Sequence, residues 1–343
     1  MYKFKYPSLV SIFVTNNCNL KCNHCCFEAG GSVHKDLTTE QMMYIIKKFT
    51  KTGIVCLDFS GGEPFLRKDF LKLVEFAFES GIQSLSIATN TLAITEQQAD
   101  DLKKLQDKYR LIYLRLSLDG AIKDTHEWLR GKDTFEKTLD KIAFLKDKGL
   151  NLRELNTVVS QKNYHEIPQI ISIAKNFGIK TSVLLPLIPV GRAKHIQDYM
   201  ITPEQWKQLC IAKKDMEKEI GIEIFADSPV STTLNEKNTG KTLPCMCGQQ
   251  FLGVLPDGRY TVCPIVSEGE SSVFEQEIDD FWANSKLICN IRDISKLTGK
   301  CSCCEYKELC RGGCRGLAHY YYRSFFKPDP LCWVTPKALQ KLD

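Results

Sequence analysis

Three cysteines near the N-terminus have the spacing of a metal-binding loop. Cys18, Cys22 and Cys25 form the pattern C-x3-C-x2-C. Three thiolates from one short loop can hold three irons of a cubane cluster, whereas an electron-transfer cluster usually takes four cysteines. The spacing therefore predicts a cluster whose fourth iron is kept open for another ligand. A zinc ion, with His24 or Cys26 as fourth ligand, is the alternative, although tetrahedral zinc sites usually draw two ligands from each of two segments.

A second group of cysteines lies in the C-terminal third of the chain. Ten of the sixteen cysteines follow residue 244, and seven of them, with one glycine, form the series C-x10-G-x4-C, C-x2-C-x5-C-x3-C, x17-C. The series consists of Cys247, Gly258, Cys263, Cys301, Cys304, Cys310, Cys314 and Cys332. The N-terminus lacks the long apolar core of a secretion signal, so we expect a reducing, cytoplasmic location where disulfides are rare. This many thiols in a reducing compartment then predict metal sites, and a pair of zinc knuckles is one possibility.

Further candidate residues lie in short motifs between positions 60 and 130. They are Gly61, Gly62, Glu63, Asn90, Ser117, Asp119 and Arg130. Glycines let a backbone approach a ligand closely, and the planar fork of an arginine donates two parallel hydrogen bonds to a carboxylate. A Gly-Gly-Glu-Pro sequence by itself is more simply a turn, and a surface salt bridge is the alternative role for Arg130. Their interpretation therefore depends on where the fold places them.

Strand-like and helical segments alternate through the first two thirds of the chain. We predict strands at 9–15, 54–59, 84–88, 111–118, 151–159 and 181–187, and helices at 39–50, 69–79, 96–108, 134–148 and 164–176, the first capped by Thr39. This alternation predicts a parallel sheet with right-handed crossovers. About six units are too few for a closed eight-unit barrel. The expected fold class is therefore α/β, with an open, partial barrel.

The predicted strands bring the candidate residues to one edge of this barrel. The cysteine loop, the Gly-Gly-Glu-Pro turn, Asn90 and the Ser-Leu-Asp-Gly turn each follow one of four successive strands. In parallel α/β folds, chemistry gathers at the carboxyl ends of the strands. The four motifs therefore predict a single site. Beyond residue 200 we expect a helix from Pro203 to Ile220, a short strand at 223–226 and a loop at 228–242.

The composition argues against several other classes of protein. Of 343 residues, 43% are hydrophobic and 25% charged, with a net charge of +5, which is ordinary for a globular protein. There is no dense run of lysine and arginine, so nucleic-acid binding is not expected. No stretch approaches the roughly 18 apolar residues of a membrane span. The length predicts a large domain with a smaller one, and we divide the chain at 1–200, 201–240 and 241–343.

The N-terminal motifs together resemble the radical SAM superfamily. In that family the three cysteines hold a [4Fe–4S] cluster, and the amino and carboxylate groups of S-adenosylmethionine (SAM) chelate its open iron. One electron from the cluster cleaves SAM, and the resulting 5′-deoxyadenosyl radical abstracts a hydrogen atom from the substrate. A partial (β/α)6 barrel is the fold of this family. The resemblance implies that Cys18, Cys22 and Cys25 bind the cluster, and that the candidate residues from Gly61 to Arg130 surround SAM.

The C-terminal series resembles the SPASM domain, an extension of some radical SAM enzymes that carries two auxiliary [4Fe–4S] clusters. The resemblance implies a nearer cluster held by Cys247, Cys263 and Cys314, and an outer cluster held by Cys301, Cys304, Cys310 and Cys332. Family members with a fully ligated nearer cluster have an extra upstream cysteine. Cys245 either supplies this ligand or leaves an open iron that could bind substrate. Metal binding would stabilise the fold of a small domain that has little hydrophobic core of its own.

Auxiliary clusters imply oxidation of the substrate beyond SAM cleavage. The resemblance implies oxidation or crosslinking of a peptide or protein side chain, as in peptide maturation. Oxidation or decarboxylation of a small molecule or tetrapyrrole is the first alternative, and a non-catalytic iron–sulfur or zinc scaffold is the second. An external electron donor such as flavodoxin or ferredoxin is expected. Because 17 residues precede Cys18, we expect a precursor peptide to be held by the barrel and SPASM surfaces or delivered by a separate leader-binding protein.

Two further segments have no assigned role at this point. They are Pro189-Val190-Gly191-Arg192-Ala193 and Asp329-Pro330-Leu331-Cys332. Both occur in peptide-modifying and in tetrapyrrole-modifying relatives of the family, so neither distinguishes the two classes of substrate.

Overall fold

A single sheet of nine strands forms the centre of the molecule. The computed structural model describes residues 5–31, 36–226, 228–234, 245–266 and 271–340. The strand order is β7-β6-β5-β4-β3-β2-β1-β8-β9, and every neighbouring pair is parallel except β8 and β9. The strands are β1 (Leu9–Thr15), β2 (Cys56–Gly61), β3 (Ser84–Ala88), β4 (Ile112–Ser117), β5 (Leu152–Val159), β6 (Thr181–Pro186), β7 (Glu223–Ala226), β8 (Phe251–Val254) and β9 (Tyr260–Thr261).

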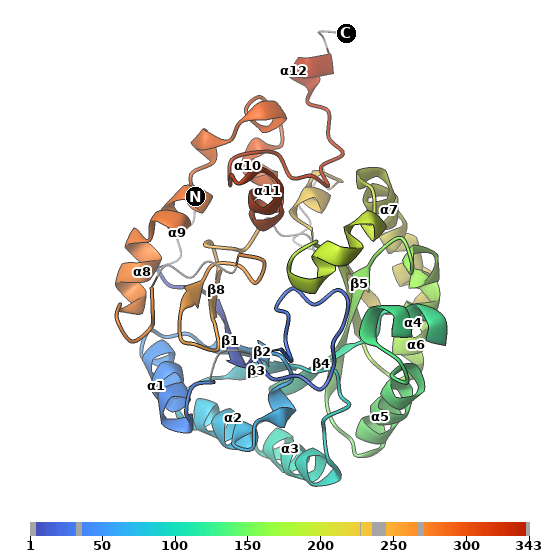
Figure 1. The fold of residues 1–343 in the computed structure, drawn as a ribbon, viewed down its shortest axis with the longest axis vertical. Coiled ribbons are helices and arrows are strands. Elements are labelled where there is room, and N and C mark those ends of the chain that lie inside the picture. The colour runs from blue at the N-terminus through green and yellow to red at the C-terminus, as the bar shows by residue number, and fades with distance from the viewer. Residues whose placement is uncertain (1–4, 32–35, 227, 235–244, 267–270, 341–343) are drawn as a thin grey trace.

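Helices surround this sheet, and the cysteine loop after β1 crosses the centre of the ring that they form (Figure 1). The helices that follow the strands are α1 (Thr39–Thr50), α2 (Phe70–Glu79), α3 (Glu96–Lys108), α4 (Lys123–Arg130), α5 (Phe135–Asp147), α6 (Ile167–Asn176) and α7 (Pro203–Ile220). The C-terminal part adds α8 (Ile278–Asn284), α9 (Lys286–Arg292), α10 (Lys307–Cys310), α11 (Arg315–Tyr322) and α12 (Lys337–Gln340). Two 3-10 segments, η3 (Gly191–Tyr199) and η4 (Pro229–Leu234), lie between β6 and β8. Among the described residues, no helix is long and apolar enough to cross a membrane.

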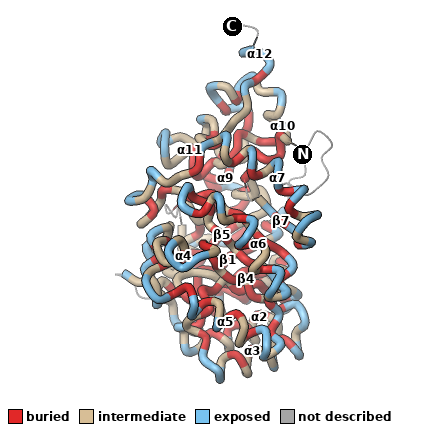
Figure 2. Tube along the Cα trace, turned by 90° about the vertical axis from the view of Figure 1, so that its right-hand side faces the viewer, coloured by how far each residue is buried: buried red, intermediate tan, exposed pale blue. Residues whose placement is uncertain are grey.

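The first helix illustrates why these segments fold as they do. Met42, Ile45, Ile46 and Phe49 are spaced on one face of α1 and are all buried in the main hydrophobic core. Burying each such side chain contributes about 1.5–3 kcal/mol. The helix has a capping box in which Thr38, and not Thr39 as predicted, accepts from the backbone of the third helical residue. The same core runs along the strands in Figure 2, where buried residues concentrate beneath exposed helix surfaces.

The opposite face of the sheet carries polar side chains. Asp58 on β2 accepts hydrogen bonds from Ser11 Oγ (2.8 Å), Ser86 Oγ (2.5 Å) and Arg115 Nη1 (2.5 Å). These residues come from β1, β3 and β4, so one carboxylate links four adjacent strands. Hydrogen bonds to a charged group are worth roughly 1.5–3 kcal/mol each. The alternation of apolar and polar residues thus sets which face meets the helices and which lines the barrel.

The partial α/β barrel is confirmed, and the structure adds three features to the prediction. The short strands β7 and β8 join opposite sides of the six-stranded sheet, so the barrel wall includes a strand of the C-terminal part. Helix α4 was not predicted, because its eight residues are mostly polar. The predicted loop at 228–242 is wrong at its start, where η4 buries four residues. The rest of that loop, from 235, lies outside the described residues.

Candidate functional site

The cysteine loop begins at the carboxyl end of β1. Cys22 is 8% exposed, and Cys18 and Cys25 are close enough for their charges to affect it. Burial raises the pKa of Cys22 to about 11, against the positive charge of Arg130, and burial also raises the pKa of Cys18. A free Cys22 thiol with this pKa stays protonated at neutral pH. A metal that displaces the proton would stabilise the thiolates in this setting.

The Gly-Gly-Glu-Pro turn after β2 packs directly against the start of this loop. Backbone N–H groups of Gly62 and Glu63 donate to the carbonyls of Thr15 and Asn17, both at 2.8 Å. A Cβ on Gly62 would lie 2.1 Å from the Asn17 carbonyl oxygen, and Gly61 has a φ of +132°. The two glycines are therefore required by the close approach of two backbones. The turn and the cysteine loop form one unit.

Glu63 extends this unit to the end of β3. Its fully buried carboxylate accepts from Thr89 Oγ1 and from the Asn90 backbone, both at 2.8 Å. Burial raises the pKa of Glu63 to about 7, while these hydrogen bonds act in the opposite direction. Asn90 in turn donates through Nδ2 to Asn19 Oδ1 at 2.8 Å, with Cys18 Sγ 3.8 Å away. A continuous chain of contacts thus runs from β3 to the first cysteine.

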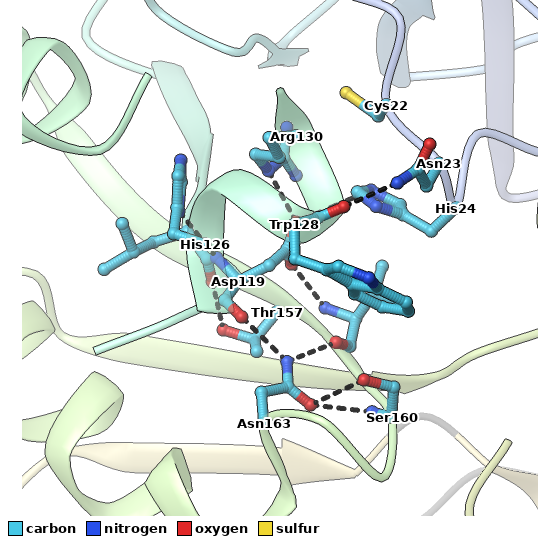
Figure 3. A network of polar contacts seen from close by, with 12 residues as sticks. Cys22, Asn23, His24, Asp119, His126, Trp128, Arg130, Thr157, Ser160 and Asn163 are labelled. Carbon is cyan, nitrogen blue, oxygen red and sulfur yellow. Dashed lines mark hydrogen bonds and ion pairs between the residues drawn. The ribbon is translucent and has the colours of Figure 1, made fainter. Parts of the chain in front are cut away.

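Asp119 lies at the centre of a buried polar network after β4 (Figure 3). Its Oδ2 accepts from Arg130 Nε at 2.5 Å, and its Oδ1 accepts from the Val158 backbone at 2.8 Å. His24 Nε2 lies 3.5 Å from the same Oδ2. Burial raises the pKa of Asp119, but Arg130 and His24 outweigh burial and hold this pKa below its ordinary value. Both carboxylate oxygens are therefore engaged inside the protein.

Two further side chains fix the backbone of this network. Asn163 donates through Nδ2 to the carbonyls of Asp119 (2.9 Å) and Val158 (2.7 Å), which joins β4 to β5. The Asp119 N–H donates to His126 Nδ1 at 3.3 Å. Burial lowers the pKa of His126 to about 4, so this ring is neutral at pH 7 and its Nδ1 can accept. Neither residue has a role in the sequence-based prediction, although Asn163 follows a predicted strand.

Arg130, the last residue of α4, connects this network to the cysteine loop. Figure 3 shows its guanidinium between Asp119 and Cys22. Within the described residues, Nε is the only atom of this side chain that donates a hydrogen bond. Asn23 fastens the loop to the same helix, because its Nδ2 donates to the Trp128 carbonyl at 2.6 Å. The Nη groups of Arg130 therefore donate no hydrogen bond to the described residues.

Ser117 lies at the end of β4, beside the same network. It is half-buried and pairs in register with Asn156 of β5. The Asn156 Oδ1 is buried without a hydrogen-bond partner among the described residues. A buried, unpaired amide oxygen is costly unless a ligand or water satisfies it. Asn156 is thus a candidate that sequence reasoning missed, because it lies within a strand and not after one.

Four thiols of the C-terminal part lie together near the barrel. The Cys247 thiol hydrogen-bonds with those of Cys245 and Cys263, and Cys314 lies near Cys245 and Cys263. Hydrogen bonding to Cys247 lowers the pKa of Cys245 to about 7 and raises that of Cys247. The Cys314 Sγ accepts from the Leu317 backbone at 3.4 Å, at the start of α11. The structure therefore brings Cys245 into the same group as the three predicted thiols.

The other four predicted thiols form a separate group. Cys301, Cys304 and Cys310 each have Cys332 as a neighbour. Burial raises the pKa of Cys301 to about 11 and that of Cys310 to about 12. All sixteen cysteines lie within the described residues and are free. In the described part of the chain, no three His, Cys, Asp or Glu side chains are arranged to hold a metal ion.

Asp329 joins these two groups. Its Oδ2 accepts from the Cys314 backbone at 2.7 Å and its Oδ1 from the Leu331 backbone at 2.9 Å, while its carbonyl accepts from the Cys332 N–H at 2.9 Å. The side chain is buried, and a Cβ on Gly313 would lie 2.4 Å from the Asp329 Cβ. One residue of the ending Asp-Pro-Leu-Cys thus connects a cysteine of each group.

This combination of a partial parallel barrel, a three-cysteine loop after its first strand and a cysteine-rich C-terminal part defines a class of iron–sulfur enzyme. Residues 12–174 match the radical SAM superfamily. The chain therefore contains a radical SAM domain, its C-terminal part is similar to those of SPASM-type enzymes, and it is an enzyme that uses a [4Fe–4S] cluster and SAM.

The relatives match nearly the whole length of this chain. The chain is 28% identical to the AdoMet-dependent heme synthase of Methanosarcina barkeri, covering 96% of this chain and 97% of the relative. It is 27% identical to the mycofactocin maturase MftC of Mycolicibacterium smegmatis, covering 98% and 85%. Streptococcus suis SuiB bound to precursor peptide SuiA superposes with a TM-score of 0.80 at 18% identity, covering 96% of this chain and 77% of SuiB. The fold is therefore shared with SuiB across nearly all of this chain.

Proposed function

We propose that this enzyme abstracts a hydrogen atom from a peptide or protein side chain and then oxidises or crosslinks that side chain, as in the maturation of ribosomally made peptides. The observation that carries the proposal is the pair of thiol groups in the C-terminal part, joined by Asp329. When bound, SAM and the clusters supply a radical initiator and electron acceptors. The PqqA peptide cyclase of Bradyrhizobium diazoefficiens, 24% identical over 97% of this chain, is a relative named for a peptide substrate.

The residues of the barrel would divide the work of holding the reactants. Cys18, Cys22 and Cys25 would ligate the SAM-binding cluster. The free Nη groups of Arg130 suit the SAM carboxylate, because a guanidinium fork binds carboxylates in two places. Asp119, whose oxygens are already engaged, would orient Arg130 and not touch SAM.

The remaining candidates fall into two roles in this proposal. Gly61, Gly62, Glu63 and Asn90 would bring the turn after β2 and the cysteine loop to one ligand, since all four contact that loop or its neighbours. Ser117 and the unpaired Asn156 Oδ1 would supply hydrogen bonds to hydroxyl groups of SAM.

The C-terminal thiols would hold the two auxiliary clusters. The proximity of Cys245 to Cys247 and Cys263 supports four cysteine ligands for the nearer cluster and argues against an open iron there. Cys301, Cys304, Cys310 and Cys332 would hold the outer cluster. The SPASM segment would span 241–343, after a barrel at 1–200 and a connection at 201–240, although β8 hydrogen-bonds to the barrel.

A reaction on a tetrapyrrole is the second candidate. The observation that favours it is the 28% identity with the heme synthase, which extends over 96% of this chain. Both candidates share the barrel site and differ in the class of substrate that is oxidised there. Both would need an external electron donor such as flavodoxin or ferredoxin in the cytoplasm, and a precursor peptide could also require a separate leader-binding protein.

Anaerobic reconstitution tests the cluster assignment. We expect about twelve irons per chain, since three cubanes hold four each. Replacing Cys18, Cys22 and Cys25 together with Ala should remove about four irons and abolish SAM cleavage, whereas Cys245→Ser should alter only the auxiliary signals. Zinc at the C-terminal cysteines, or unchanged iron in the triple variant, would contradict the assignment.

The substrate is tested separately by mass spectrometry. The reconstituted enzyme is incubated with SAM, reductant and either a short peptide encoded beside its gene or a porphyrin of haem biosynthesis. We expect the peptide to lose hydrogen atoms while 5′-deoxyadenosine accumulates. Turnover of the porphyrin alone would establish the second candidate.

A further inference from the structure

One residue beyond β6 contacts the cysteine loop at three points. Arg192 donates through Nε to the Cys22 carbonyl and through Nη1 to the Ala29 carbonyl, both at 2.9 Å. Its backbone N–H donates to the Cys25 carbonyl at 3.0 Å. Arg192 therefore satisfies backbone carbonyls of two of the three loop cysteines and of a residue near the end of the loop. Arg192 follows β6 and the cysteine loop follows β1, so the contact joins segments that follow strands far apart in the strand order.

The preceding glycine shows that this contact is built into the backbone. Gly191 has a φ of +62°, and a Cβ at this position would lie 2.6 Å from the carbonyl oxygens of both Cys25 and Cys26. No larger residue fits without moving the loop or η3. The Pro-Val-Gly-Arg-Ala segment thus brings a glycine for close approach and an arginine for the hydrogen bonds. Ala193, next in the segment, is fully buried.

The loop has a second support on its other side. The Asn23 N–H donates to the Leu129 carbonyl at 2.8 Å, and Asn23 Nδ2 donates to the Trp128 carbonyl, so α4 holds the residue next to Cys22. Arg192 holds the Cys22 carbonyl itself. The backbone at Cys22 and Asn23 is therefore held between α4 and η3.

We propose that Arg192 is a positioning residue that fixes the cysteine loop in the conformation needed to hold the SAM-binding cluster. This inference rests on the proposed role of Cys18, Cys22 and Cys25 as its ligands. Arginine is suited to this task because a planar fork can reach two carbonyls at once, which the single ammonium of lysine does not reproduce. The role is that of a brace on the backbone and does not require Arg192 to touch SAM or substrate.

Lys194 provides a matched control in the same segment. Its Nζ lies 3.3 Å from Glu28 Oε1, so it also reaches the loop region. Both side chains are about half exposed, and such surface ion pairs contribute little. The set of variants is therefore Arg192→Met, Arg192→Lys and Lys194→Met, all in the full-length chain.

The first measurement is amide hydrogen exchange of residues 16–31 by mass spectrometry, before and after anaerobic reconstitution. In Arg192→Met we expect at least tenfold faster exchange in this loop, because two hydrogen bonds from a charged donor are lost. Arg192→Lys should resemble Arg192→Met, and Lys194→Met should resemble the wild type. A wild-type exchange rate in Arg192→Met would overturn the proposal. A wild-type exchange rate in Arg192→Lys would show that a positive charge alone is sufficient, and it would overturn the role of the planar guanidinium in holding the loop.

The second measurement is the electron paramagnetic resonance spectrum of the reduced protein with and without SAM. The signal that responds to SAM reports the barrel cluster in the presence of the auxiliary ones. We expect Arg192→Met to lose or broaden this signal while the auxiliary signals remain, and a wild-type SAM response would overturn the proposal. If the triple variant of Cys18, Cys22 and Cys25 kept the signal that responds to SAM, the assignment of the cluster to these cysteines would fail. The hydrogen-exchange measurement would still test whether Arg192 holds the loop.

Discussion

Replacing Asp119 alone should lower the free energy of unfolding more than replacing Asp119 and Arg130 together, because the single change leaves the Arg130 charge buried without its partner. In Asp119→Asn the amide oxygen can still accept from the Val158 N–H, so the main loss is the charge that faces Arg130. Arg130 is 9% exposed, and a buried charge left without its partner destabilises a protein by about 3–5 kcal/mol. Replacing both residues, as in Asp119→Asn with Arg130→Met, removes both charges of this pair. The double variant should therefore be at least about 2 kcal/mol more stable than the single variant.

Native-state hydrogen exchange in increasing urea measures these differences locally. The informative peptides cover residues 112–119 and 152–160, where β4 and β5 meet the network. Asp101→Asn, which removes an exposed helix ion pair with Lys104, is the control and should leave exchange unchanged. Additive destabilisation in the double variant, or a single variant as stable as the wild type, would refute the claim that charge pairing decides the stability of this network.

Two further substitutions test other contacts at the two sites. Gly62→Ala should displace the cysteine loop and lower the iron bound at the barrel, because the new Cβ would lie 2.1 Å from the Asn17 carbonyl oxygen. Gly31→Ala is the control and should bind iron normally, because the nearest atom to its new Cβ would be 3.7 Å away. Equal iron content in the two variants would contradict this prediction. Asp329→Ala should destabilise the C-terminal part by about 2–5 kcal/mol, because two buried N–H groups lose their acceptor. Asp329→Asn keeps one acceptor, so its midpoint of thermal unfolding should lie between those of Asp329→Ala and the wild type. Equal midpoints in Asp329→Ala and the wild type would contradict the role of Asp329 in joining the two thiol groups.

Most of the strand and helix pattern could be predicted from local sequence, because each element has its own apolar period and end signals. The six predicted strands and the helix from Pro203 to Ile220 are all present. Helix α4 was missed because tertiary contacts, and not an apolar stripe, hold its polar sequence in place. The attachment of β8 to β1 was also beyond local sequence, because pairing between residues 9–12 and 251–254 depends on the path of the whole chain.

The sequence by itself determined the class of enzyme, because cysteine spacing within one loop is a local property that limits which metal groups can bind. It also indicated which strand ends would carry the site. Only the tertiary structure decided how those residues act on one another. It showed that Asp119 is enclosed by Arg130 and Val158, that Cys245 lies with Cys247 and Cys263, and that residue 192 supports a loop around residue 22. These contacts join segments far apart in the chain, and no periodicity or spacing records which carbonyl a distant arginine will meet.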